Sequence, residues 1–540
     1  ARPVPFVMRF DASGWMRDRW GGRLAMASLV AAQSVLYLKR LHPGAAEGDS
    51  GELQWAAPLL GICHSPGYAL QVSAGKVFSL LPVGRSVAWR MNLMSAVFGV
   101  IGCIALFSAV RRITGRSLPA WVAGMMLAFS SVYWSQATIA EVYVFGAAFI
   151  LLAIEAATRL IETGRVVWLA TMAVMLGVAV AERPSEIMIV PAFLGLWLGS
   201  RKRVSMTAAR WLAAAGWFLL PFVVAFGLNI AHSDPHRFAV RDDMLRDTMI
   251  GYQPGEVTFD YTHRSGVAAA TRSTLSFMLG LSWSPRIGWG GARDSLRKYA
   301  WLVSGLGIWG SRFAPAGMTD VMLRGGMSLG PPGVLLALAG VFFWRRRPGW
   351  ALLGLGLCAG NLVFLLVYKV WDSLTFTIPG LIGMSLLAGL GCAGPPDLPA
   401  AVSRTWRWRV HGTACVVACL LLVPINDRYV DRDTLQERSY QELLERVARA
   451  PLPREAVILT RYWPAMELRY LFWIQAVRRD VSVIHAARGT HLRLAVLFRN
   501  EGRPVYFTRG LLPRARERAL LRDTPEQLRP LGFVRFENPR

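Results

Sequence analysis

The chain has 540 residues, of which 54% are hydrophobic and 17% are charged, and its formal net charge is +26. Soluble proteins carry about 25% charged residues, and apolar runs of roughly 18–22 residues, the length of a membrane-spanning helix, recur along this chain. The composition therefore excludes an ordinary soluble domain and predicts a polytopic membrane protein.

In chain order, a basic lead-in at residues 1–20 precedes a predicted transmembrane domain over residues 21–425. The first apolar run lacks a convincing cleavage site, so we expect a retained span rather than a signal peptide. The short run at 186–200 and the apolar stretches near 67–82 and 299–313 could be re-entrant or interfacial. With the run at 186–200 counted, the apolar runs predict about eleven spans, near residues 22–38, 89–110, 118–135, 141–160, 166–181, 186–200, 209–231, 329–345, 349–368, 373–391 and 409–425.

Basic residues divide the loops between these spans into two sets. With the N-terminus inside, every inside loop is basic, as the positive-inside rule requires, through Arg111/Arg112/Arg116, Arg159/Arg165, Arg201/Lys202/Arg203, Arg345/Arg346/Arg347 and Arg404/Arg407/Arg409. The positive charge is thus explained by topology and by the lipid bilayer, and we expect no nucleic-acid partner. The same rule places a loop at 40–88, a long loop at 232–328 and the tail at 426–540 on the outer side.

The tail has no apolar span and alternates short strands with helical patterns. Strands are predicted at Ala456–Thr460, Val481–His485 and Pro504–Thr508, and helices near 464–477 and 490–500. This alternation predicts a small C-terminal α/β domain with parallel strands. The six cysteines are scattered along the chain without metal-site or disulfide spacing, so we interpret them as small core residues.

Acidic residues gather at the outer ends of the predicted spans, and each has a structural explanation. Asp49 and Glu52 share one face if a helix starts near Ser50, so Asp49 could cap that helix and Glu52 could complete a capping box. His64 lies in a turn, Glu141 opens a span where the helix dipole favours an acid, and Glu182, Arg183 and Glu186 could form an ion pair at a helix break. Lys369 and Asp372 flank Trp371 in an interfacial arrangement. Jointly they predict a mixed-charge pocket at the outer membrane face, which is a candidate functional site.

Several motifs in this region resemble the signature of the DUF2723 family of membrane proteins. That family includes protein O-mannosyltransferases of the transmembrane-protein-260 type and is similar to the GT-C glycosyltransferases. The resemblance is dense over residues 40–185, although Glu182-Arg183 stands where an Asn-His-like pair is expected and Ser65 replaces a Pro. The motifs are Gly48-Asp49-Ser50-Gly51-Glu52, Gly61-x-x-His64-x-Pro66-Gly67-Tyr68, Gly75-Lys76-x-Phe78, Leu81-Pro82, Ala88-Trp89-Arg90-x-Asn92-Leu93 and Trp134-Ser135-Gln136-Ala137-x-x-Ala140-Glu141-Val142-Tyr143.

The resemblance implies a GT-C-like enzyme that transfers a sugar, mannose in the named relatives, from a polyprenyl-phosphate donor to a hydroxyl on a protein, glycan or lipid. A phosphate leaving group needs no general acid, so one carboxylate suffices as the base. We expect Asp49 to be that base, with Glu52 and His64 orienting it, and inversion at the anomeric carbon. Substrate-binding candidates are Tyr68, Arg90, Glu141, Tyr143, Arg183, Lys369 and Asp372, among which the cations would hold the phosphate.

Two other functions fit the sequence. A transporter or flippase would also use intramembrane charges and broken helices, although it would need polar groups at the midplane. A non-catalytic assembly subunit would use the Arg-rich tail for docking. No cofactor is certain, but Asp49 and Glu52 could hold a divalent metal. The Arg/Ala/Leu-rich composition favours a bacterial inner membrane, with the site and the tail facing the periplasm.

Overall fold

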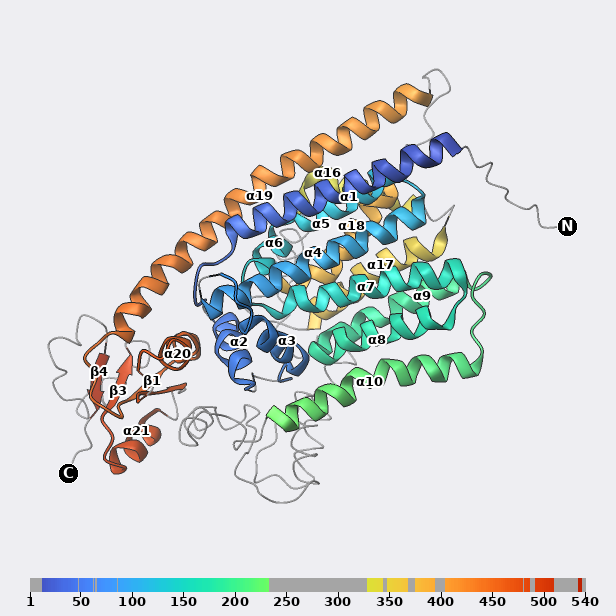
Figure 1. Ribbon diagram of the computed structural model, residues 1–540. Helices are drawn as coiled ribbons and strands as arrows, with labels where there is room; N and C mark the ends of the chain where they lie inside the picture. Colours follow the sequence, from blue (N-terminus) through green and yellow to red (C-terminus); the bar gives the residue numbers. More distant parts are fainter. Residues whose placement is uncertain are drawn as a thin grey trace.

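The computed structural model describes residues 12–46, 48–61, 63, 66–84, 86–232, 328–342, 347–367, 374–393, 404–478, 480–485, 491–508 and 533–536. These residues form a long helical bundle with a small sheet-containing domain at one end (Figure 1). The predicted run at 299–313 and most of the long loop at 232–328 lie outside the described residues.

The helices follow the apolar runs. Those of the bundle are α1 (Ala12–Arg40), α2 (Gly48–Leu59), α3 (Ala69–Ser79), α4 (Val87–Thr114), α5 (Ser117–Ala128), α6 (Ser131–Ala137), α7 (Val142–Thr163), α8 (Val166–Glu182), η1 (Pro184–Ile189), α9 (Val190–Ser200), α10 (Ala208–His232), α16 (Gly330–Val341), α17 (Pro348–Val367), η4 (Thr375–Thr377), α18 (Ile378–Cys392) and α19 (Arg404–Ala448).

Each of the eleven predicted runs falls on a helix, and the mainly helical membrane fold is confirmed. In the described part of the chain, six helices are long and apolar enough to cross a membrane (α4, α7, α10, α17, α18 with η4, and α19), and four apolar helices are shorter (α5, α8, η1 with α9, and α16). With α1 they match the predicted runs one for one, while the exact span count stays a prediction. The run at 118–135 is divided between α5 and α6, and the stretch at 67–82 forms the short helix α3.

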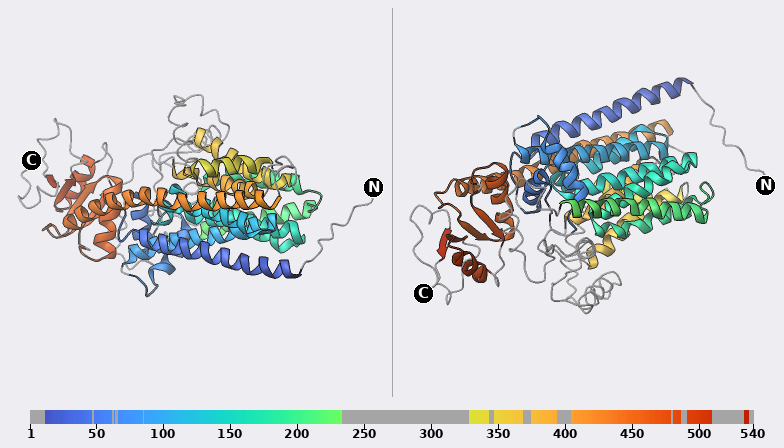
Figure 2. Two further views of the ribbon diagram at one scale, coloured as in Figure 1. Left: turned by 90° about the horizontal axis from the view of Figure 1, so that it is seen from above. Right: turned by 60° about the horizontal axis from the view of Figure 1, so that its bottom comes forward.

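Successive helices run back and forth between two ends of the bundle (Figures 1 and 2). The end that carries α2, α3, the start of α7 and the end of α8 is called here the α2 end. The opposite end, where α4, α7 and α9 finish, carries Arg111, Arg159 and Arg201 and is called the basic end. The helix directions therefore agree with the alternation on which the topology prediction rests.

Glycine residues let the helix main chains approach closely, as is usual in membrane bundles. A Cβ atom at Gly340 on α16 would collide with the main-chain oxygen of Leu387 on α18, and one at Gly391 on α18 would collide with that of Leu336 on α16. The reciprocal contacts leave no room for a side chain at either glycine, so the α16–α18 pairing depends on both.

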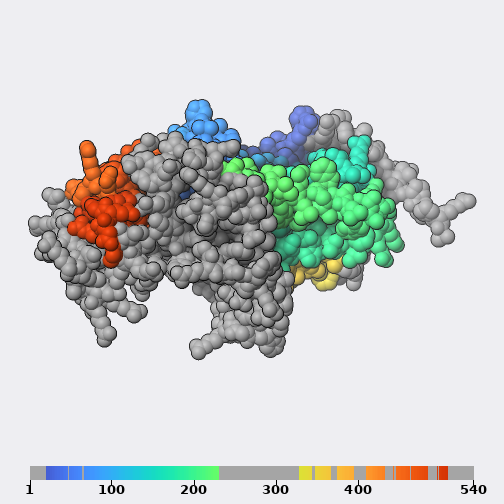
Figure 3. Space-filling view, turned by 90° about the horizontal axis from the view of Figure 1, so that it is seen from below, coloured from blue at the N-terminus to red at the C-terminus, as the bar shows by residue number. Residues whose placement is uncertain are grey.

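Helices α10 and α19 present apolar side chains to the surroundings rather than to the bundle. Only 11% of the span window of α10 and 22% of that of α19 are buried. Large exposed apolar residues on α10 include Leu212, Leu219 and Val223, and in Figure 3 this helix, coloured green, forms part of the surface. Apolar surface of this extent belongs in contact with lipid.

The tail forms a four-stranded sheet in the order β2-β1-β3-β4. Strand β1 (Val457–Thr460) pairs in parallel with β2 (Ser482–His485) and with β3 (Val505–Thr508), so the three predicted strands and their direction are confirmed. Strand β4 (Phe533–Phe536), which the sequence analysis does not predict, pairs antiparallel with β3. Helices α20 (Tyr462–Arg469) and α21 (His491–Asn500) match the predicted helical patterns.

The bundle and the tail share one helix. Helix α19 has 45 residues and runs without a break through the predicted boundary at 425/426. Arg40, at the end of α1, forms two 2.7 Å hydrogen bonds with the carboxylate of Asp427 and a further ion pair with Asp431. The tail is therefore held to the bundle by a continuous helix that is itself tied to α1.

Candidate active site

Asp49 and Glu52 lie close together in the first turns of α2, at the α2 end of the bundle. The helix begins at Gly48, whose φ of +63° is easily adopted only by glycine. Asp49 thus stands inside the first turn rather than at the N-cap, which corrects the capping interpretation. Glu52 is 0% exposed, whereas Asp49 is partly exposed. Of the two carboxylates, Asp49 is therefore the one that is accessible from outside the protein.

A buried amide network fixes the chain that leads into α2. The side-chain amide of Gln54 donates to Asn92 Oδ1 at 2.8 Å and accepts from the main-chain N–H of Ala46 at 2.9 Å. Asn92 in turn donates to the main-chain oxygen of His42 at 2.9 Å. Both amide side chains are fully buried, so they hold the loop before Asp49 in one conformation. Gln54 carries no pattern by which sequence analysis could single it out.

Tyr68 stands at the N-terminus of α3 in a strained main-chain conformation. Its φ of 48° is in the left-handed region that non-glycine residues rarely adopt. Burial raises the pKa of its phenol well above the usual value, and the nearby charge of Asp49 raises the pKa further. The phenol therefore stays protonated at neutral pH and can donate a hydrogen bond beside Asp49.

Glu141 and Glu182 use their oxygens to connect helices. Glu141 accepts from the Ser50 hydroxyl at 2.8 Å and from the main-chain N–H of Val142 at 3.3 Å, so it caps α7 and holds α2. The carboxylate of Glu182 accepts the N–H groups of Leu70 and Gln71 at 2.9 and 3.2 Å, at the start of α3. Both are buried. These contacts favour a positioning role for Glu141 over the direct substrate contact expected from sequence.

Arg183 follows the last residue of α8, at the α2 end of the bundle, and lies against two aromatic rings. It forms a 2.7 Å ion pair with Glu186, and both side chains are 5% exposed or less. Its guanidinium carbon lies 4.4 Å from the ring centroid of Tyr143 and 5.0 Å from that of Phe376. A small cavity lined by Arg183, Glu186 and Phe376 lies alongside. Of the two acids in the predicted Glu182–Arg183–Glu186 cluster, it is therefore Glu186 that forms the ion pair with Arg183.

The other predicted residues are distributed differently. His64, Lys369 and Asp372 lie outside the described residues. Arg90 is on α4, two residues after Ala88, whose main-chain N–H donates to the hydroxyl of Tyr470 of the tail at 2.8 Å. Arg90 is thereby associated with the tail interface rather than with Arg183.

The tail domain covers α2, a contact that sequence analysis does not predict. A Cβ at Gly51 would meet Met466 Cβ at 3.3 Å and the main-chain nitrogen of Glu467 at 3.4 Å. The rings of Trp55 and Trp473 meet edge to face at 5.7 Å. In Figures 1 and 2 helix α20 lies against the α2 end. The side of α2 that carries Gly51 and Trp55 is therefore covered by the tail domain, which restrains the helix that carries Asp49 and Glu52.

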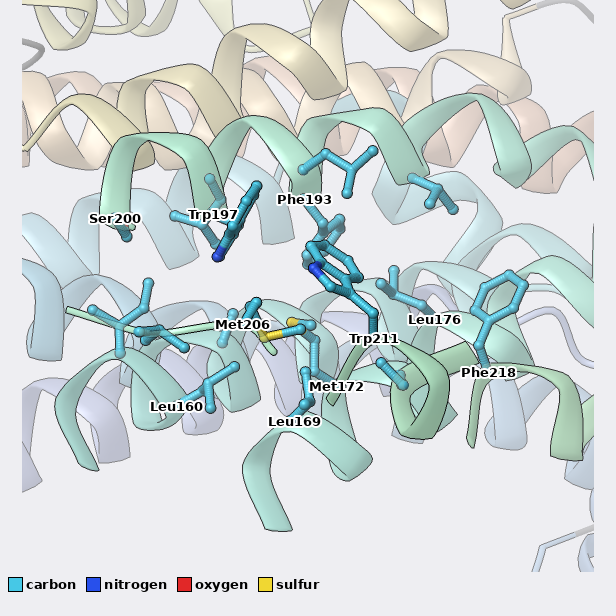
Figure 4. Close-up of a pocket in the computed structure, with 18 of the residues that line it drawn as sticks. Leu160, Leu169, Met172, Leu176, Phe193, Trp197, Ser200, Met206, Trp211 and Phe218 are labelled. Atoms are coloured by element: carbon cyan, nitrogen blue, oxygen red, sulfur yellow. The ribbon is translucent and has the colours of Figure 1, made fainter. Parts of the chain in front are cut away.

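A larger cavity of about 250 Å³ lies toward the basic end, between α7, α8, α9 and α10 (Figure 4). Its wall is almost wholly apolar and includes Met172, Phe193, Trp197 and Trp211. A cavity of this kind accepts hydrocarbon rather than a hydroxylated sugar. The polar cluster at the α2 end is therefore the better candidate for chemistry, although its cavity is smaller.

The acidic residues do not form a compact metal site by themselves. Among the residues that the structure describes, one group of three potential ligands has its ligand atoms within 4.8 Å of one another, and it consists of Cys392, His411 and Cys415. Asp49 and Glu52 belong to no such group. The arrangement at the α2 end instead offers one accessible carboxylate, a phenol donor and a buried guanidinium, which suits acid–base chemistry next to an anion.

The fold is similar to that of a solved structure over almost the whole chain. The structure of ArnT from Cupriavidus metallidurans bound to undecaprenyl phosphate superposes with a TM-score of 0.51, covering 97% of this chain and 98% of that one, at 13% sequence identity. This likeness defines the architecture. With its apolar helices, it identifies the chain as an integral membrane protein.

The segment that carries the candidate site matches a narrower group. The family model described as the protein O-mannosyl-transferase TMEM260 N-terminal domain matches residues 49–206, which confirms the resemblance seen in the motifs. The mouse protein O-mannosyl-transferase TMEM260 is 38% identical over 133 residues, and the Dictyostelium discoideum protein of the same name is 30% identical over 117. These alignments cover 24% and 21% of this chain and only 18% and 14% of the relatives' lengths.

Proposed function

We propose that this protein is a membrane glycosyltransferase that moves a sugar, mannose in the first instance, from a polyprenyl-phosphate donor to an acceptor hydroxyl. The observation that carries the proposal is Asp49, a partly exposed carboxylate in a rigid polar cluster at one end of an apolar bundle. It lies within the segment that matches the O-mannosyl-transferase family. The ArnT fold, known with undecaprenyl phosphate bound, supports a polyprenyl-phosphate donor.

In the proposed reaction Asp49 removes the proton from the acceptor hydroxyl as its oxygen attacks the anomeric carbon. The bond from that carbon to the phosphate oxygen breaks, and the polyprenyl phosphate leaves with the electron pair as an anion. Attack opposite the leaving group inverts the anomeric configuration. Since the phosphate is already a good leaving group, no general acid is needed.

The remaining residues bind and orient. Glu52 and His64 orient the base, and Tyr68, Tyr143 and Asp372 contact the sugar or the acceptor. Arg183 and Lys369 hold the phosphate. A guanidinium has five N–H donors, so the single ion pair of Arg183 with Glu186 leaves donors for phosphate oxygens. Arg90 acts from α4 beside the contact between Ala88 and Tyr470 of the tail, and Glu141 acts through its hydrogen bond with Ser50.

We place the site and the tail on the non-cytoplasmic side, periplasmic in a bacterium, because the opposite end carries the basic loops. The position of the charges also favours an enzyme over a transporter. In the described spans, most charged side chains stand toward the helix ends, as Glu182 and Arg112 do, whereas a transporter needs polar groups near the midplane. The more central Glu155 of α7 is held in ion pairs with Arg112 and Arg159 at 3.2 and 2.8 Å. The acceptor is a hydroxyl on protein, glycan or lipid.

The test is transfer of radiolabel from polyprenyl-phosphate sugars by purified protein in detergent or liposomes. Asp49→Asn should lower transfer by at least about 10²-fold, the usual contribution of a general base. Its matched control, Asp480→Asn, changes a carboxylate on the tail whose partner is Arg478 and should transfer normally. Undiminished transfer by folded Asp49→Asn would refute the assignment of the base. Movement of intact donor across the membrane without transfer would favour the flippase.

A further inference from the structure

Two cysteines and a histidine from different helices meet near the basic end of the bundle. Cys392 is the last residue of α18, and His411 and Cys415 are one turn apart near the start of α19. One ligand atom of each lies within 4.8 Å of the other two, and Cys415 Sγ is 3.9 Å from His411 Nε2. Both cysteines are buried and His411 is partly exposed.

We propose that Cys392, His411 and Cys415 bind a zinc ion. Zinc lies about 2.3 Å from thiolate sulfur and about 2.0–2.1 Å from imidazole nitrogen, in tetrahedral geometry. These bond lengths place neighbouring sulfur and nitrogen ligands about 3.6 Å apart, close to the 3.9 Å between Cys415 and His411. Two soft thiolates and one imidazole form a ligand set that selects zinc over calcium or magnesium. A water molecule completes the four-coordinate site.

Neighbouring groups hold the end of α18 in place beside these ligands. Arg116 donates to the main-chain oxygen of Ala393, the residue after Cys392, at 3.2 Å. The His411 ring interacts with the main-chain carbonyl groups of Gly391 and Cys392 at the end of α18. A ligating histidine usually donates its second ring nitrogen to such a carbonyl, which fixes its orientation.

The site would join helices rather than take part in sugar transfer. Helix α18 starts next to Phe376 and the candidate active site and has 15 residues. Cys392, at its other end, therefore lies about 20 Å along the bundle from the candidate active site. The zinc would connect α18 to α19 across a chain segment of eighteen intervening residues, 393–410. Since α19 carries the tail that covers α2, this connection would stabilise the frame of the active site from the opposite end.

This interpretation replaces the view that these cysteines are merely small core residues. The separation of Cys392 from His411 matches no common zinc motif in the sequence, and the pair His411–Cys415 is inconspicuous by itself. The packing of α18 against α19 supplies the missing juxtaposition. It also makes a Cys392–Cys415 disulfide the main competing chemistry, and the experiment must separate the two.

The experiment measures metal in full-length protein purified without a polyhistidine tag and without chelator. Elemental analysis should find about one zinc per chain, and Co²⁺ added after zinc removal should give thiolate-to-cobalt charge-transfer absorption. Cys415→Ser and His411→Ala should each lose the zinc and the absorption. Cys103→Ser, which alters a fully buried cysteine on α4, is the matched control and should keep both.

A second readout covers variants that fold poorly. Chelator treatment of the wild-type protein should lower its melting temperature, and zinc should restore it, whereas the melting temperature of His411→Ala should not respond to either. Retention of zinc by His411→Ala and Cys415→Ser would overturn the proposal. So would wild-type protein that binds neither zinc nor cobalt, or a Cys392–Cys415 disulfide found by mass spectrometry in the purified protein.

Discussion

The buried pair Arg183–Glu186 allows a quantitative test of the site's architecture. The two charges are 2.7 Å apart and 5% and 3% exposed, and the guanidinium also contacts the rings of Tyr143 and Phe376. The test compares Arg183→Gln, Glu186→Gln and the double variant. Each single change removes one charge and leaves the other buried without its partner.

The expected magnitudes follow from burial. Removing one partner of a buried ion pair costs about 3–5 kcal/mol, largely because an uncompensated charge remains. Arg183→Gln also loses contacts with two rings, each contributing about 0.5–2 kcal/mol. The double variant removes both charges of the pair, so neither is left buried without its partner. We therefore expect its loss of stability to be smaller than the sum of the single losses by about 2 kcal/mol or more, a coupling typical of neighbouring groups.

The assay is SDS-induced unfolding in mixed micelles, followed by tryptophan fluorescence. The exposed pair Glu445–Arg449 is the control, because its side chains are 37% and 74% exposed, and Arg449→Gln should leave the unfolding free energy nearly unchanged. Additive losses in the double variant, or Glu186→Gln as stable as wild type, would refute the view that these charges balance each other inside the protein.

Two further predictions concern packing and pH. Gly340→Ala should destabilise the protein by about 1–3 kcal/mol, because its Cβ collides with the main-chain oxygen of Leu387, whereas Gly216→Ala on α10 meets nothing within 4 Å and should be neutral or slightly stabilising in thermal unfolding. The hydrogen bond from Arg478 lowers the pKa of Asp480 in the folded tail. A carboxyl with a lowered pKa contributes stability above its unfolded pKa of about 3.9 and loses it as the pH falls through the folded value. Asp480→Asn should therefore be less stable than wild type at pH 7 and equally stable at low pH, and an undiminished difference at low pH would contradict this cause.

The helices and strands that could be predicted from the sequence are those with a clear local pattern of apolar and polar residues. The eleven apolar runs fall on helices, and the strands at 457–460, 482–485 and 505–508 are within a residue of their predicted bounds. Hydropathy and strand propensity depend on neighbouring residues, so they can be read along the chain. Strand β4 was missed because four residues, Phe533–Phe536, carry too little pattern and depend on pairing with β3.

Only part of the candidate site could be predicted from the local sequence pattern. The sequence by itself placed Asp49, Glu52, Glu141 and Arg183 at one end of the bundle, since hydropathy determines which loops share a side. Only the tertiary structure decided that Glu186, rather than Glu182, pairs with Arg183. That choice depends on the side-chain directions at the helix break between α8 and η1.

The longest-range features were decided by packing alone. Gln54 meets Asn92, the tail helix α20 covers Gly51, and Cys392 approaches His411 only because whole helices have particular rotations about their axes. Many rotations bury a similar apolar area, so hydropathy does not distinguish among them. Steric fit at close contacts, such as that of Gly340 with Leu387, distinguishes among these rotations. That fit exists only in the folded protein.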